Sequence, residues 1–175
     1  ATLDNIDDHY IEITTYKGSS LENGMRYYAT VTAVDESGNE ISSGFMVVSA
    51  IPMDNIPPEP IEDLVVVDKP SDDQGYVLLS WTPSLAPDFD HYNIYVSQLY
   101  ISDVSVLNPE KVVYGRMNTT NIEINTVGGL QLENNKTYYF YVTAVDICGN
   151  EQTTGLYPAT GTPIDDIQPA PLKDL

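Results

Sequence analysis

The sequence is poor in the residues that most often carry chemistry or bind polyanions. It holds one cysteine, two histidines, and only 7 Lys and Arg against 26 Asp and Glu, a formal net charge of −19. A lone cysteine forms no internal disulfide, and this charge repels nucleic-acid phosphates and anionic lipid headgroups. No apolar run approaches the roughly 20 residues that span a bilayer. We therefore expect no disulfide framework, no nucleic-acid partner and no membrane insertion in this segment.

Recognised catalytic spacings are also missing. His9 and His91 are the only imidazoles, and Cys148 has no sequence-matched histidine. Asp88 and Asp90 could in principle serve as the carboxylate pair of a glycosidase, but aspartates before a strand commonly make turn hydrogen bonds. We therefore predict that the chain is not an enzyme.

The chain does contain an internal repeat. Tyr27–Asp35 (YYATVTAVD) reappears as Tyr138–Asp146 (YYFYVTAVD), with a constant offset of 111 between the two copies. At this offset, residues 1–64 and 112–175 share 26 identities in 64 pairs without a gap. The chain thus holds about 1.6 copies of one unit.

The repeat defines the expected domains. Residues 1–52 are the C-terminal part of one module, 53–60 a Pro-rich linker, 61–163 a complete module, and 164–175 the linker and first strand of a following module. A half module cannot close its own core, because its inward-facing residues have no opposite sheet. Either further residues of a longer polypeptide or a neighbouring chain must supply the missing strands, and strand exchange between chains is one specific form.

Hydrophobic periodicity indicates the fold class. Short runs rich in Val, Ile, Tyr and Thr, bounded by Pro, Gly, Asn and Asp, are typical of an all-β sandwich, and no amphipathic helix is visible. Within the long connection 98–115, Asn108–Glu110 could start a single helical turn. The expected strands cover residues 61–67, 77–82, 91–97, 121–125, 137–145 and 157–161.

Alternation within the strand 137–145 assigns its core face. Tyr138, Phe140, Val142 and Ala144 point to one side of the strand and are expected in the core. The equivalent residues of the first copy are also apolar: Tyr27, Ala29, Val31 and Ala33.

At this point the sequence resembles a fibronectin type III domain, over the complete unit and both partial ones. The features are Trp81 in VLLSWTPS, the alternating segment DFDHYNIYVS, and Leu132 six residues before Tyr138, which runs into FYVTAVDICGNE and is similar to the family's tyrosine corner. The resemblance implies an immunoglobulin-like β-sandwich in tandem repeats with a period of 111. The period is longer than the family's usual module, and we place the excess between the strands expected at 91–97 and 121–125.

Similar modules occur in tandem on prokaryotic surface proteins and in secreted enzymes. The resemblance therefore implies a non-enzymatic structural protein, extracellular or at the cell surface, whose modules stack into a filament, stalk or surface layer with copies of the chain as partners. Two alternatives stay open: an accessory spacer module of a secreted hydrolase, and a carbohydrate- or cell-binding adhesin.

Calcium is the candidate cofactor, bound at the module junctions. In this topology the loops 83–90 and 146–151 lie at the end of the sandwich where the preceding linker enters, and calcium prefers carboxylate and carbonyl oxygens. Solvated acidic loops with turn-forming aspartates are the alternative. The candidate ligands are Asp54, Asp88, Asp90 and Asp146 at this end, and Asp72, Asp73, Asp165 and Asp166 at the opposite end.

Tyrosine is frequent, with 13 in the chain. Tyr95, Tyr139 and Tyr141 are expected on the outward faces of neighbouring strands, as an aromatic patch for a lateral protein contact or for glycans. Ordinary strand propensity is the alternative. Asn118 and Asn135 start N-glycosylation sequons, whose number does not exceed chance.

Overall fold

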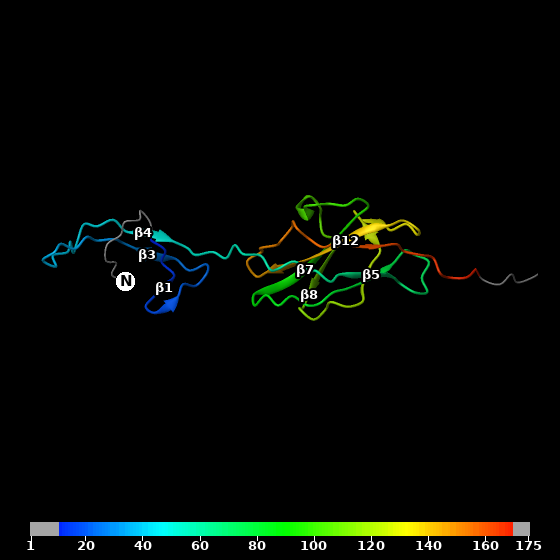
Figure 1. Ribbon diagram of the computed structural model, residues 1–175, viewed down its shortest axis with the longest axis horizontal. Helices are drawn as coiled ribbons and strands as arrows, with labels where there is room; N and C mark the ends of the chain where they lie inside the picture. Colours follow the sequence, from blue (N-terminus) through cyan, green and yellow to red (C-terminus); the bar gives the residue numbers. More distant parts are fainter. Residues whose placement is uncertain (1–10, 170–175) are drawn as a thin grey trace, which may run out of the picture. The chain divides into compact units, whose positions relative to one another are not determined.

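The computed structural model describes residues 11–169, and it divides the chain into two compact units (Figure 1). The first unit ends at Asp54 and the second starts at Asn55. The strand expected to open a following module, around Asp174 and Leu175, lies outside the described residues, as does His9.

The second unit is an all-β sandwich of two antiparallel sheets, as the sequence predicts. The larger sheet has the strand order β13–β12–β7–β8, and the smaller has the order β5–β6–β9. The chain crosses from the smaller sheet to the larger one between β6 and β7. The bounds are Val65–Asp68 (β5), Val77–Ser80 (β6), Phe89–Ser97 (β7), Lys111–Tyr114 (β8), Ile122–Ile124 (β9), Tyr138–Asp146 (β12) and Ala159–Gly161 (β13).

Strand β6 shows how the sequence pattern produces this packing. Val77 and Leu79 are buried, whereas the residues that follow each of them are half-buried, so the strand alternates between core and surface. Just before it the chain turns at Gly75, whose φ is 69°. A Cβ there would lie 2.5 Å from the Leu132 carbonyl oxygen, so the turn requires glycine.

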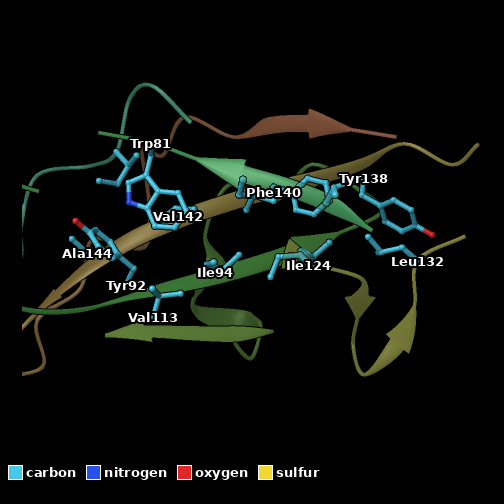
Figure 2. Packing of buried hydrophobic residues seen from close by; sticks show 14 residues of the cluster. Trp81, Tyr92, Ile94, Val113, Ile124, Leu132, Tyr138, Phe140, Val142 and Ala144 are labelled. Atoms are coloured by element: carbon cyan, nitrogen blue, oxygen red, sulfur yellow. The ribbon is translucent and has the colours of Figure 1, made fainter. Parts of the chain in front are cut away.

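The core lies between the two sheets (Figure 2). The ring of Trp81 packs edge-on against that of Tyr92, with 5.2 Å between the ring centroids. Strand β12 supplies the face that alternation predicted, and this prediction is confirmed, because its four residues belong to the cluster between the sheets: Tyr138, Phe140, Val142 and Ala144.

The segment after β7 covers the outer face of the larger sheet. Val104 lies in the 3-10 turn η1 (Val104–Val106) and packs with Tyr95 and Tyr141 in a second apolar cluster. The backbone N–H of Val104 donates to the Thr153 carbonyl, which ties this turn to the connection that leads to β13.

Three elements of the second unit differ from the sequence prediction. The helical turn lies at η1 and not at Asn108–Glu110, because the carboxylate of Asp103 accepts a hydrogen bond from the Ser105 N–H and caps the turn there. Strand β8 and the small hairpin of β10 (Thr126–Val127) and β11 (Leu130–Gln131) were not predicted. Along residues 11–169, no helix is long and apolar enough to cross a membrane.

The first unit contains two short antiparallel strand pairs. Strand β1 (Thr15–Tyr16) pairs with β2 (Ser19–Ser20), and β3 (Tyr27–Ala29) pairs with β4 (Val48–Ala50). The turn between β1 and β2 passes through Gly18, with φ at 85°.

These strand pairs have counterparts in the second unit at the offset of the sequence repeat. Thr15 faces Ser20 as Thr126 faces Gln131. Tyr27 faces Ala50 as Tyr138 faces Gly161. Three hydrogen bonds also recur at the same offset. The bond from Leu21 N to Thr14 O corresponds to that from Leu132 N to Asn125 O, and the bond from Gly24 N to Pro52 O corresponds to that from Asn135 N to Pro163 O. The bond from Glu22 N to Tyr27 Oη corresponds to that from Glu133 N to Tyr138 Oη.

Burial does not recur. No residue from 11 to 54 is buried. Val31 is 81% exposed, whereas its counterpart Val142 is 3% exposed, and Ile13 is 53% exposed against 4% for Ile124. Residues 11–54 therefore repeat strand pairs and turn hydrogen bonds of the back half of the second unit, without the strands that cover that half there.

Candidate functional site

Two of the aspartates predicted to bind calcium lie together in the second unit. Carboxylate oxygens of Asp88 and Asp146 lie within 4.8 Å of each other, and the Ile147 N–H donates to the Asp88 carbonyl. Asp90 does not join them by any contact that the structure shows, and its carboxylate lies 2.7 Å from Nδ1 of His91. Asp54 ends the first unit, so its approach to this pair stays a prediction, as does calcium itself.

Asp146 closes the tight turn after β12. Its Oδ1 accepts hydrogen bonds from the backbone N–H groups of Cys148 and Asn150, and its Oδ2 accepts from the Asn150 side chain. Burial opposes ionisation of this carboxyl, but the hydrogen bonds outweigh it and hold its pKa below the ordinary 3.8. The bonds stabilise the turn whether or not a cation binds.

The first unit shows the same arrangement without burial. The carboxylate of Asp35 accepts from the N–H groups of Ser37 and Asn39 and from the Asn39 side chain, which holds the pKa of Asp35 below its ordinary value. Because the exposed copy has the same bonds, turn formation accounts for the aspartate at this position.

At the opposite end of the second unit, two of the four predicted aspartates meet. The carboxylate of Asp166 accepts from the backbone N–H groups of Ser71 and Asp72, and the Asp166 N–H donates to the Asp72 carbonyl. Asp165 caps the Ile167 N–H next to it in the chain, and Asp73 accepts a bond from Asn134 only through its backbone carbonyl. Asp166 thus holds the departing chain against the turn at Ser71 and Asp72.

Asp72 has one further feature. Its Oδ1 accepts from the N–H groups of Gln74 and Tyr76, whereas its Oδ2 is buried and has no hydrogen-bond partner in the structure. Within residues 11–169, no acidic cluster of three or more forms around it.

The structure contradicts the prediction that Tyr95 and Tyr141 form an exposed aromatic patch on the outer face. Tyr95 and Tyr141 do face each other across β7 and β12, but they are 4% and 1% exposed, because η1 and its flanking residues lie over them. Tyr139 is half-buried and contacts the ring of Tyr100. Tyr95 and Tyr141 therefore do not form an exposed pair for a partner or a glycan.

A polar network lies beneath the same cover. The carboxylate of Glu151 accepts hydrogen bonds from the Tyr95 hydroxyl at 2.7 Å, from the Asn93 side chain at 3.1 Å and from the Thr143 hydroxyl. Burial, with the neighbouring Glu151 carboxylate, raises the pKa of Tyr95. All three bonds end on Oε1 of Glu151, and they join β7 and β12 to the residues that follow the turn after β12.

Of the two histidines and the cysteine considered for catalysis, His91 and Cys148 lie within residues 11–169. His91 contacts Asp90 and the ring of Tyr114, and Cys148 lies exposed in the turn that Asp146 closes. A surface hollow lies between residues 59–63 and 82–86 and is lined by three carboxylates, those of Glu59, Glu62 and Asp63. Asp63 accepts hydrogen bonds from the hydroxyl and the N–H of Thr82, which hold the pKa of Asp63 low.

The sequence analysis did not identify the structural role of Arg116. The guanidinium of Arg116 donates to the carbonyl oxygens of Ser84 and Ala86 and lies 5.2 Å from the ring centroid of Phe89. It stabilises the loop between β6 and β7. The scarcity of basic residues in the chain is the signal that could have drawn attention to it.

Comparisons with known proteins give little guidance. No family model matches the chain, and no curated protein matches it. Among solved structures, the chain is similar to the spore cortex lytic enzyme SleM of Clostridium perfringens, with a TM-score of 0.42 and 19% identity over 61% of this chain. The chain spans 29% of that enzyme's length, and the likeness carries no argument about activity.

Proposed function

We propose that this chain is part of a non-enzymatic, extracellular structural protein in which modules similar to fibronectin type III domains repeat head to tail. The observation that supports the proposal is the recurrence of strand pairs, turn hydrogen bonds and the tyrosine-to-backbone bond at the offset of the sequence repeat. A repeated contact set suits a spacer, whose role is to set distance and direction.

The chain that leaves the second unit is held against it, which also supports a spacer role. Besides the bonds of Asp166 to Ser71 and Asp72, the Ile164 N–H donates to the Asp68 carboxylate at 2.7 Å. Such contacts fix the direction in which a following module would start, because they restrain a linker that would otherwise sample many conformations.

Stacking of such modules would give a filament, a stalk or a surface layer, with copies of the chain as partners. Calcium at the junctions would stiffen the array, and the acidic pair Asp88 and Asp146 is where the second unit offers oxygens for it. The high negative charge suits a soluble surface in a medium that contains cations.

Small-angle scattering of a lengthened chain tests the spacer role. A further copy of residues 57–167 is joined after Ile167, which continues the repeat without a gap. The maximum dimension is expected to grow by the length of about one module, on the order of 30–40 Å for nine-residue strands. Asp166→Ala is expected to reduce the gain by releasing the departing chain, and a dimension that does not grow contradicts the proposal.

A further inference from the structure

We infer that the first unit is an acceptor for the front half of a module, a β-rich segment that brings two strands with the patterns of β6 and β7. The inference rests on the repeat argued above and deepens the proposed function, because it names what covers the exposed face of the first unit. The occupant is a polypeptide of the type represented by residues 55–111 of this chain.

Two stretches of the first unit that have no strand partner within residues 11–169 define where the segment would pair. In the second unit, β9 pairs with β6, and residues 141–146 of β12 pair with β7. The counterparts of these stretches are residues 11–13 and 30–35, and neither forms a strand in the first unit. Because β6 and β7 are consecutive in sequence, a single front-half segment can supply both missing partners.

The exposed side chains are those that such a segment would bury. Val31 and Ile13 are largely exposed in the first unit, and Val142 and Ile124 at the equivalent positions belong to the core of the second. The partners that cover them there come from the front half of the unit: Ile61, Val77, Leu79, Trp81, Tyr92, Ile94 and Val96. An apolar face of this kind in water favours burial by about 25 cal/mol per Å².

One difference between the halves affects the fit. Ala50 takes the place of Gly161, where a Cβ would lie 2.4 Å from Cγ1 of Val66 in β5 and 3.1 Å from the Phe140 ring. Ala29 takes the place of Phe140, which removes that ring. The remaining clash falls on the residue equivalent to Val66, so a segment with a smaller residue there fits the first unit best.

Other occupants predict different behaviour. A second copy of this chain has its own residues 61–113 within the core of its second unit, so it could not donate them without opening that sandwich. Two first units could instead pair through their exposed faces, which would make the chain a dimer that protects residues 30–34 without any added segment.

The test is hydrogen exchange on fusions in which residues 55–111 are joined directly before Ala1, which follows residue 111 in the frame of the repeat. Two parent fusions are compared, one with the segment unchanged and one with Val66→Ala in the added copy. The amides of residues 30–34 are expected to exchange on the order of a hundredfold more slowly than in the 175-residue chain in at least the Val66→Ala fusion.

Matched variants make the result specific. Ile94→Asp in the added copy, or Val31→Asp in the first unit, is expected to abolish the slowing, while the sandwich of the second unit keeps its own protection as an internal control. No slowing in either parent fusion overturns the inference, as does equal slowing in both Asp variants. Protection of residues 30–34 in a self-associated chain without the added segment overturns it in favour of a second copy. None of these results alters the scattering test of the spacer role.

Discussion

The same sequence motif forms strands of very different extent in the two units. YVTAVD is the last part of β12, a nine-residue strand, whereas in the first unit the related TVTAVD contributes only one isolated bridge after the three-residue β3. Local propensity is nearly the same in both copies, so the difference comes from the partner: β12 lies between β13 and β7, and β3 pairs with β4 alone. A strand extends as far as it is paired.

The contacts that survive in the first unit are those local to the back half. The turn of Asp35, the bond from the Glu22 N–H to the Tyr27 hydroxyl and the pairing of β3 with β4 need no residue from a front half. A buried interior does need residues from a front half, and residues 11–54 do not supply them. Substitutions at equivalent positions should therefore have strong effects in the second unit and weak ones in the first.

The largest difference is expected between Val142→Asp and Val31→Asp. A carboxylate at Val142 would be buried without a partner, which should lower the free energy of unfolding of the second unit by about 3–5 kcal/mol. Trp81, the only tryptophan, lies in that core, so its fluorescence during denaturation reports on the second unit alone. Val31→Asp should leave the curve unchanged, and equal effects would contradict the comparison.

A smaller difference is expected for Asp146→Ala and Asp35→Ala. Removing the Asp146 carboxylate leaves the N–H groups of Cys148 and Asn150 without their acceptor, a loss of about 1–2 kcal/mol in the stability of the second unit. Asp35→Ala should not change the Trp81 transition. A loss of stability in the Asp35 variant as large as in the Asp146 variant would refute the assignment of these bonds to separate units.

The lowered pKa of Asp146 predicts that the stability of the second unit depends on pH. Because the folded-state pKa of Asp146 is lower than the ordinary 3.8, its contribution to stability is fully present above that value and is lost as the pH falls through the folded-state pKa. Chemical denaturation at several acidic pH values should therefore show a steeper fall in stability for the natural chain than for Asp146→Ala. Parallel curves would mean that the carboxylate does not stabilise the folded state.

A further small difference is expected for Tyr138→Phe and Tyr27→Phe. The hydroxyl of Tyr138 accepts the Glu133 N–H at 3.0 Å, and its loss should cost about 0.5–1.5 kcal/mol in urea denaturation of the second unit. The equivalent bond in the first unit, from Glu22 to Tyr27, has no influence on the Trp81 signal, so Tyr27→Phe serves as the control. A shift of the urea midpoint in Tyr27→Phe but not in Tyr138→Phe would contradict the assignment of the two bonds to separate units.

The smallest effect is expected from calcium. If the Asp88 and Asp146 pair contributes to a junction site, the melting temperature of the second unit should rise with added calcium and return with a chelator, by mass action. Asp88→Asn should remove the rise, whereas Asp73→Asn, at the other end of the unit, should not. An identical melting temperature in calcium and in chelator would reject the site.

The sequence allowed the sandwich and the core face of β12 to be predicted, because period-2 alternation states which side chains point inward. Trp81 and Tyr138 lie in one shared interior, as expected. The burial of Tyr95 and Tyr141 could not be predicted, since the cover over them comes from an irregular segment around Val104 whose path follows no period.

The candidate metal site was predicted less completely. Topology brings the loops of Asp88 and Asp146 to the same end of the sandwich, and they do meet. Asp90 differs because its neighbour His91 offers a closer partner, and Asp166 binds backbone N–H groups of the turn at Ser71. Such local competition among hydrogen bonds depends on side-chain geometry that spacing alone does not specify.

The most direct test of the account is an NMR measurement of cross-strand contacts between backbone protons in the intact chain. The account predicts that Tyr27 lies opposite Ala50 as Tyr138 lies opposite Gly161, and that Thr15 lies opposite Ser20 as Thr126 lies opposite Gln131. The account would be contradicted if the second unit showed its expected contacts while residues 15–50 showed a different strand pairing or a helix.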